Sequence, residues 1–434
     1  MMMEVEIITR DTIKPSSPTP SHLKTYNLSY FDQLTPQIFV PILLYYNYTK
    51  STTSTSSSTC LKESLSKCLT KFYPLAGRLK DGIFVDCNDA GVDYLEAKVK
   101  NCSLSDVVAN PKIDSLKQLL PGEPQTLESE SGSESPLVVV QVNQFQCGGL
   151  VIGMWILHKV ADATSLSSFI NGWSSTNRGD NVAVAPHFEL ATLFPGRKIE
   201  GYQVTEGIGE EKIATKRFVF NASAIATLRD GARHGSSVES PTRVEVVSAF
   251  MWKRFIESNR SKSHPNRKDY MAFHTVNLRK RRDPPLAEHG FGNMCIGVNA
   301  LVAAENDVDD LSSLIGKIRV AIRGVDGEFV KKVESGDEEY LNHIMAEIMK
   351  ACEGEGEKEQ IDFSSWCRLG LYDADFGWGK PVWVSPTLNL KNFVILMDTR
   401  SGDGIEAWVN MLEEDLVRLE NDPELLSFAS ETTI

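Results

Sequence analysis

Two strongly apolar runs lie almost next to each other and limit what this chain can fold into. The first covers residues 137–145 and is β-branched and partly alternating, and the second covers residues 150–157. Gly148 and Gly149 separate them, which is typical of two strands joined by a turn. A helix is predicted next, because apolar side chains recur at helical spacing in Leu166, Phe169, Ile170 and Trp173. This succession of strands and helix predicts an α/β fold.

The length of the chain predicts two domains. A single hydrophobic core stops growing at roughly 250–300 residues, and this chain has 434. Between residues 177 and 211 the apolar pattern gives way to Gly, Pro and charged residues, which indicates a linker. The predicted organisation is therefore an N-terminal domain over 1–176, a crossover linker over 177–211 and a C-terminal domain over 212–434.

Further elements have their own local signals. An apolar stripe predicts a helix that begins near residue 57 and ends before Pro74; its members are Leu61, Leu65, Cys68, Leu69 and Phe72. Asn221 is a candidate helix cap, and Thr242 with Glu245 forms a capping-box pattern ahead of another helix. Residues 393–397 read as a buried strand, so the second half also alternates helices with strands.

The charge and the cysteine pattern limit which partners and which cellular environment are expected. Lys and Arg number 45 against 58 Asp and Glu, and the net charge of -13 disfavours nucleic acid and anionic membranes. No apolar run approaches the ~20 residues that cross a bilayer, and the first ten residues lack a secretory pattern. The eight cysteines form no CxxC pair, so no zinc site or disulfide framework is predicted. We expect a cytoplasmic monomer without a metal.

One histidine stands out as a candidate catalytic residue. The signatures GxGxxG, GxxxxGK[ST], HExxH and GxSxG are absent from the chain. His158 closes the second apolar run, and Asp162 follows four residues later at the start of the predicted helix. A neutral imidazole at a strand end could accept a proton near pH 7. The alternative is structural, with a core histidine and an aspartate that caps the helix.

A second motif is the run from Asp375 through Phe376 and Gly377 to Trp378 and Gly379. Its two glycines permit positive φ on either side of the tryptophan. The tryptophan could then fill a hydrophobic gap while the aspartate bonds nearby backbone or an arginine. We interpret this run mainly as a structural clamp, with direct ligand contact or a second acid–base role for Asp375 as the alternative.

With these two motifs the sequence resembles the plant BAHD acyltransferase family, which transfers acyl groups from coenzyme A to alcohols or amines. The resemblance covers nearly the whole chain. It extends to four further segments, which occur in the family's order: residues 13–20, 28–34, 72–78 and 276–279 with 291–293. The helix that follows His158 is most similar to the branch of acetyl-CoA-dependent alcohol acetyltransferases that contains vinorine synthase.

The resemblance implies a fold like chloramphenicol acetyltransferase, with mixed sheets flanked by helices and a channel between the two domains. It also implies that His158 is the general base and that Asp162 points away from substrate and pairs with Arg279. Arg279 could instead belong to a solvated basic turn, because Lys280, Arg281 and Arg282 follow it. Acetyl-CoA would be a co-substrate, with no permanently bound cofactor. Candidate contacts for its phosphates are Lys253 with Arg254, or the basic run at 279–282, and either could be ordinary surface charge.

The function that follows is transfer of acetyl from acetyl-CoA to a hydroxyl of a plant specialised metabolite, an alkaloid or a terpenoid. Four alternatives stay open at this point. The acceptor could be an amine, or the donor an aromatic or malonyl thioester. The chain could also be a non-catalytic binding member of the same fold, or a hydrolase.

Overall fold

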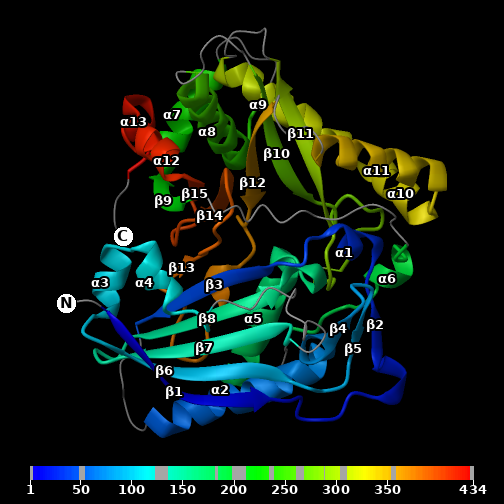
Figure 1. Ribbon diagram of the computed structural model, residues 1–434, viewed down its shortest axis with the longest axis vertical. Coiled ribbons are helices and arrows are strands. Elements are labelled where there is room, and N and C mark those ends of the chain that lie inside the picture. The colour runs from blue at the N-terminus through cyan, green and yellow to red at the C-terminus, as the bar shows by residue number, and fades with distance from the viewer. Residues whose placement is uncertain are drawn as a thin grey trace.

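The structure is a computed structural model that describes residues 3–47, 54–122, 135–180, 184–197, 212–233, 239–260, 268–287, 289–303, 310–352 and 358–430. Figure 1 shows two α/β halves, one above the other along the long axis of the molecule. Each half is built on a six-stranded sheet that contains parallel and antiparallel pairs. The predicted α/β fold with mixed sheets is confirmed.

The first sheet has the strand order β1-β6-β7-β8-β3-β13. Its strands are β1 (Glu4–Ile13), β3 (Phe39–Tyr46), β6 (Val92–Lys100), β7 (Val138–Phe145), β8 (Leu150–Leu157) and β13 (Trp383–Ser385). A small sheet of order β2-β5-β4 lies beside it, made of β2 (Thr25–Asn27), β4 (Arg78–Lys80) and β5 (Phe84–Asp86). The helices of this half are α1 (Tyr30–Leu34), α2 (Ser54–Lys71), α3 (Leu104–Ala109), α4 (Ile113–Lys117) and α5 (Ala163–Arg178), with 3-10 helices η1 (Ser21–Leu23), η2 (Tyr73–Ala76) and η3 (His158–Val160).

The second sheet has the order β11-β10-β12-β14-β15-β9. Its strands are β9 (Ile213–Phe220), β10 (Asp269–Asn277), β11 (Cys295–Val302), β12 (Lys358–Ser365), β14 (Phe393–Asp398) and β15 (Ile405–Leu412). Its helices are α7 (Ala222–Arg233), α8 (Arg243–Arg260), α9 (Leu311–Gly324), α10 (Gly327–Ser335), α11 (Glu338–Cys352), α12 (Glu413–Glu420) and α13 (Pro423–Phe428). The 3-10 helix η4 (Leu371–Asp373) also comes late in the chain but packs against α5 of the first half. The short helix α6 (Leu190–Leu193) lies in the predicted linker, of which 181–183 and 198–211 fall outside the described residues.

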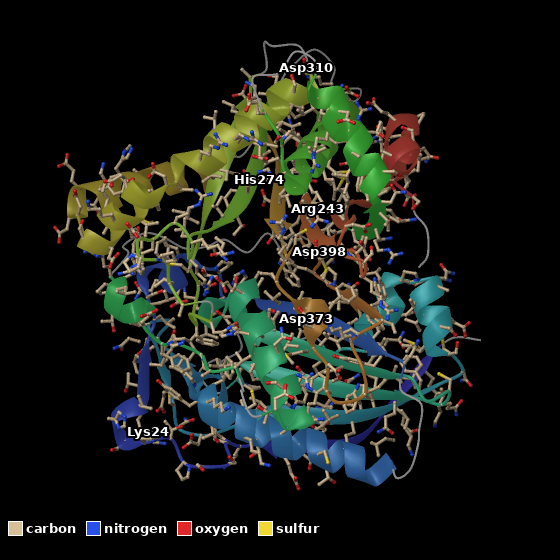
Figure 2. The ribbon with its side chains drawn as sticks, turned by 180° about the vertical axis from the view of Figure 1, so that it is seen from behind. Lys24, Arg243, His274, Asp310, Asp373 and Asp398 are labelled. Carbon is tan, nitrogen blue, oxygen red and sulfur yellow. The ribbon has the colours of Figure 1, made fainter. Side chains whose placement is uncertain are left out.

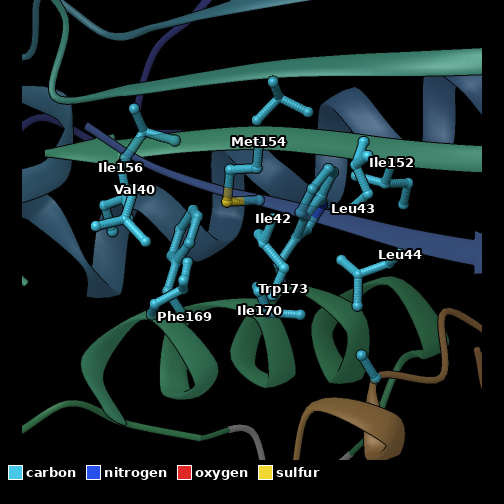
Figure 3. Packing of buried hydrophobic residues seen from close by; sticks show 14 of the residues in the cluster. Val40, Ile42, Leu43, Leu44, Ile152, Met154, Ile156, Phe169, Ile170 and Trp173 are labelled. Atoms are coloured by element: carbon cyan, nitrogen blue, oxygen red, sulfur yellow. The ribbon is translucent and has the colours of Figure 1, made fainter. Parts of the chain in front are cut away.

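Helix α5 packs on the first sheet and positions the loop after β8. Figure 3 shows its apolar side chains against those of β3 and β8; the contacting residues are Val40, Ile42, Leu44, Ile152, Met154, Ile156, Phe169, Ile170 and Trp173. On its other side Phe72 meets Phe169 edge to face, and the indole of Trp173 donates to the carbonyl oxygen of Leu61. Helix α5 therefore packs beside α2 on the same face of the sheet, where Lys62 of α2 pairs with Glu96 of β6. Its N-terminus is fixed where the histidine loop ends.

The local signals of the sequence predict these elements well. The two apolar runs form β7 and β8, and the stripe that begins near residue 57 lies on α2. Asn221 accepts from the backbone N–H of Ala224 at 2.8 Å at the start of α7. Thr242 and Glu245 exchange both bonds of a capping box ahead of α8.

One strand lies in the half opposite to its place in the sequence. Although β13 comes late in the chain, it pairs antiparallel with β3 at the edge of the first sheet. Phe376 and Trp383 are buried in the same hydrophobic cluster as the first sheet. The segment that contains the second motif therefore belongs spatially to the N-terminal half.

Candidate active site

His158 is the first residue after β8, at the beginning of η3. Its backbone N–H donates to the carbonyl oxygen of Ile38 at 2.8 Å, which ties the end of the strand to the segment before β3. The side chain is partly exposed, yet it lies so deep among protein atoms that burial lowers the pKa of its imidazole below the ordinary value. The ring is therefore neutral near pH 7, the form that accepts a proton.

The histidine contacts one residue of the second half directly. Nδ1 of His158 lies 3.1 Å from Oδ1 of Asn293, a fully buried residue in the loop between β10 and β11. The amide nitrogen of Asn293 donates to the backbone oxygen of His158 and to Oδ1 of Asp32, each at 2.8 Å. Asp32 is also fully buried, and burial raises the pKa of its carboxyl to about 6. Neither residue was predicted to have a role, although both occur in segments that carry the family resemblance.

Asp162 has two structural roles at once. Its Oδ1 accepts from the backbone N–H of Ser165 at 2.9 Å, so it caps α5 as the structural interpretation predicts. Two nitrogens of Arg279 also donate to its carboxylate, at 2.6 and 3.1 Å. Burial alone would raise the pKa of Asp162, but the charge and hydrogen bonds of Arg279 hold the pKa below its ordinary value. The pairing that the resemblance implies is present and joins the two halves.

The solvated-turn interpretation of Arg279 is wrong. Its exposed fraction is 4%, and its guanidinium also donates to the carbonyl oxygens of Gly290 and Gly292. Because a bidentate bond between arginine and carboxylate is directional, Arg279 fixes the loop at 290–292 relative to the start of α5. Asn293 is the next residue of that loop.

The second motif forms a clamp beside the far end of α5. Oδ1 of Asp375 accepts from the backbone N–H groups of Gly377 and Gly379 at 2.8 and 2.9 Å. Both glycines have positive φ, 101° and 105°. Trp378 stacks on Phe376 and lies edge to face against Tyr46 of β3. Asp373, just before the motif, lies below Arg243 and Asp398 of the other half in Figure 2.

The length of α5 separates this clamp from the histidine. The guanidinium of Arg178, the last residue of α5, lies 3.8 Å from the carboxylate of Asp375 and donates to its backbone oxygen at 2.9 Å, whereas Asp162 caps the first turn. A helix of 16 residues spans roughly 24 Å at 1.5 Å per residue. The geometry supports the structural interpretation of Asp375 rather than an acid–base role beside His158.

The basic residues suggested as phosphate contacts are mostly engaged in other bonds. Arg254 is 4% exposed and pairs with three carboxylates, those of Glu257, Asp422 and Glu424. These carboxylates around Arg254 argue against its predicted contact with the phosphates of coenzyme A. In the run at 279–282, Arg281 donates to backbone carbonyls and Arg282 pairs with Glu334.

Neither a metal site nor a membrane-spanning helix occurs in the described part of the chain. It contains no group of three or more His, Cys, Asp or Glu side chains placed to hold a metal ion. None of its helices is both long and apolar enough to cross a membrane.

A strand-end histidine contacts the other half, and the aspartate–arginine pair beside it joins both halves. The family model described as "Transferase family" matches residues 3–426. The chain belongs to this family, the BAHD acyltransferases.

Individual relatives agree with this assignment over the whole length. The chain is 41% identical to stemmadenine O-acetyltransferase of Catharanthus roseus over 97% of both chains. It is 40% identical to limonoid 21-O-acetyltransferase of Melia azedarach over 99% of both. The crystal structure of vinorine synthase, an enzyme of Rauvolfia serpentina, matches with a TM-score of 0.85 at 37% identity, covering 99% of this chain and 100% of that one. The resemblance to that branch is confirmed.

Proposed function

We propose that this protein transfers an acetyl group from acetyl-CoA to a hydroxyl of a plant specialised metabolite, an alkaloid or a terpenoid. The observation that carries the proposal is the neutral imidazole of His158, a half-buried residue at the contact between the halves. The relatives support the reaction class, since two of them are named O-acetyltransferases and one is named for a limonoid.

The histidine acts as a general base. Complete removal of a proton from an aliphatic hydroxyl by a free imidazole would cost roughly 12 kcal/mol, because their pKa values are about 15.7 and 6.5. Proton transfer to His158 therefore accompanies attack of the hydroxyl oxygen on the thioester carbonyl. A base in this position contributes about 10²–10⁴-fold to the rate.

No acyl-enzyme is needed. The thiolate of coenzyme A leaves the tetrahedral intermediate more readily than an alkoxide, because a thiol has a pKa of about 8.5. His158 returns its proton to the departing sulfur, so the products are the acetyl ester and free thiol. Asp162 does not contact the reacting atoms; through Arg279 it holds the loop at 290–293 against the histidine.

The two halves form the site together. We propose domains over 1–176 and 212–434 joined by 177–211, with β13 returning to the first sheet and a channel between the halves for the two substrates. Of the two α8 candidates for the phosphates of coenzyme A, Lys253 is the one with a partly exposed side chain, 24%. It remains the proposed contact. The protein would act as a cytoplasmic monomer.

A donor and acceptor panel tests this reaction class. The purified protein would be supplied with acetyl-, malonyl- and aromatic acyl-CoA, each with hydroxylated alkaloids, hydroxylated triterpenoids or amines. We expect free thiol from acetyl-CoA only when a hydroxyl acceptor is present, with an acetylated product detected by mass. Full thiol release without acceptor would indicate a hydrolase, and no release from any pair a binding protein; either result contradicts the proposal.

The lowered pKa of His158 predicts the acid limb of the pH profile. The base is lost when the imidazole is protonated, so kcat/KM should fall as the pH drops through the pKa of His158. Burial holds that pKa below the ordinary 6.5, so the midpoint of the acid limb should lie below pH 6.5. An acid limb centred above pH 6.5, measured with saturating acetyl-CoA, would contradict this assignment.

Replacing Asp375 with alanine tests the clamp interpretation. The change removes two hydrogen bonds to backbone N–H groups, so we expect a loss of about 1–2 kcal/mol in the free energy of unfolding. Urea denaturation measures this, and kcat of the folded fraction should stay within about 3-fold of the unmodified protein. A large loss of kcat at unchanged stability would instead assign Asp375 a direct role.

A further inference from the structure

The side chain of Asn293 is oriented by two groups that accept hydrogen bonds. Its amide nitrogen lies 2.8 Å from the backbone carbonyl oxygen of His158, which has no proton to give. The same nitrogen lies 2.8 Å from Oδ1 of Asp32, which also accepts the backbone N–H of Asn293 at 2.6 Å. Rotating the amide by 180° would place its oxygen against the carbonyl oxygen of His158. The hydrogen-bond network therefore fixes which end of the amide faces which partner.

This orientation determines which ring nitrogen of His158 carries the proton. With both N–H bonds of its amide used, Asn293 can present only its oxygen to Nδ1 of His158, at 3.1 Å. Oδ1 accepts and cannot donate, so Nδ1 must be the protonated nitrogen of the neutral ring. The lone pair of the neutral imidazole is then on Nε2.

The loop that carries Asn293 is held from both sides. Arg279 and the hydroxyl of Ser165 both donate to the carbonyl oxygen of Gly292. The backbone N–H of the next residue, Met294, donates to Asp162 at 3.2 Å. Asp32 in turn is fixed by two hydrogen bonds from Ser29, at 2.8 and 2.7 Å. Asn293 therefore has little freedom to turn away from the ring.

We propose that Asn293, oriented by Asp32, is a positioning residue that holds His158 in the Nδ1–H tautomer and so makes Nε2 the basic atom. The tautomer itself follows from hydrogen bonding alone. Only the expected effect on kcat rests on the proposed function. Asn293 would act through His158 and not on the substrate.

A neutral partner suits a base that must stay unprotonated. The charged groups around His158 are Asp162, Asp32, Arg279 and Lys159. Asp162 is neutralised by Arg279, and the ammonium of Lys159 donates to the carbonyl oxygens of Gln33 and Thr35 at 2.8 and 3.0 Å. No carboxylate bonds the ring itself among the described residues. An amide at this position orients the imidazole without the large rise in pKa that a directly bonded carboxylate would cause.

Asn293→Ala tests the proposal, with Asn143→Ala as the matched control. Asn143 is also a fully buried asparagine whose amide donates to backbone carbonyls, but it lies on β7 against Leu119 and Val151. We expect Asn293→Ala to lower kcat about 10–100-fold, with KM for acetyl-CoA within about 3-fold. Asn143→Ala should lower stability and leave kcat of the folded protein unchanged. An equal loss of kcat in both variants would overturn the proposal, since the effect would then be structural.

A spectroscopic measurement on the unmodified protein reports the tautomer directly. Two-bond ¹H–¹⁵N spectra of protein labelled at histidine distinguish the two tautomers, and the missing signal in His158→Gln assigns the ring. We expect the neutral ring of His158 to carry its proton on Nδ1, and Asn293→Ala to shift the population toward Nε2–H. A ring protonated on Nε2 in the unmodified protein, or an unchanged spectrum in Asn293→Ala, would overturn the proposal. Full turnover in His158→Gln would instead remove the proposed function and leave the tautomer assignment standing.

Discussion

His158→Ala should lower kcat with acetyl-CoA and a hydroxyl acceptor by about 10²–10⁴-fold while the protein stays folded. Under the proposed function, the variant removes the group that would accept the hydroxyl proton. The substitution removes the hydrogen bond between the ring and Asn293, so we expect a loss of about 1–2 kcal/mol in the free energy of unfolding, which leaves the protein folded. Thiol release and product mass measure the activity, and a thermal melt measures folding.

His274→Gln is the control for this substitution. His274 is another deeply buried histidine, on β10 of the second half, where it stacks on Phe363 with ring centroids 4.8 Å apart. Figure 2 labels it in the upper part of the picture, where the second half lies. Its replacement should affect stability more than turnover. Near-normal turnover in His158→Ala would remove this residue from the mechanism.

Arg279→Met should destabilise the protein by about 3–5 kcal/mol, because it leaves the carboxylate of Asp162 buried without its cation. The pair is 5% and 8% exposed at its two side chains, so solvent cannot replace the lost partner. The loop with Asn293 should also loosen, and kcat of the folded fraction should fall. Urea denaturation and turnover of the same preparation measure the two effects.

The loss of stability in Arg279→Met should depend on pH in one direction. In the unmodified protein the pKa of Asp162 is held low, so the stability from this pair is present at neutral pH and is lost as the pH falls through that low pKa. In Arg279→Met burial raises the pKa of the Asp162 carboxyl, which is then protonated at a higher pH. The difference in the free energy of unfolding between the unmodified protein and Arg279→Met should therefore be largest at neutral pH and become smaller in acid.

Arg282→Met is the matched control for Arg279→Met. Arg282 pairs with Glu334 three positions along the same basic run, but at side chains that are 17% and 30% exposed. An ion pair this accessible contributes only about 1 kcal/mol or less to the free energy of unfolding. Equal destabilisation by both substitutions would contradict the account of Asp162 and Arg279 as a buried joint between the halves.

Elements with strong local patterns could be predicted from the sequence. The apolar runs that became β7 and β8, the stripe on α2 and the caps at Asn221 and Thr242 depend on neighbours within a few residues. The two glycines around Trp378 likewise have the positive φ that the pattern suggested. In each case the physical signal is periodicity or a backbone preference that the sequence itself displays.

Long-range placement could not be predicted in the same way. Nothing local in residues 383–385 shows that this strand leaves its own half to pair with β3. Arg254 looks like a free cation on a helix until the fold brings Asp422 and Glu424 from the C-terminal segment against it. Asp32 and Asn293 are 261 positions apart in the chain, and their roles appear only when both meet at His158.

A crystal structure of the protein with coenzyme A and a hydroxylated acceptor tests the central claim most directly. We predict that the acceptor oxygen lies about 2.6–3.2 Å from Nε2 of His158, with the sulfur of coenzyme A on the same side of the ring. A bound acceptor whose hydroxyl faces another side chain, or an imidazole sealed from both ligands by apolar neighbours, would contradict the account.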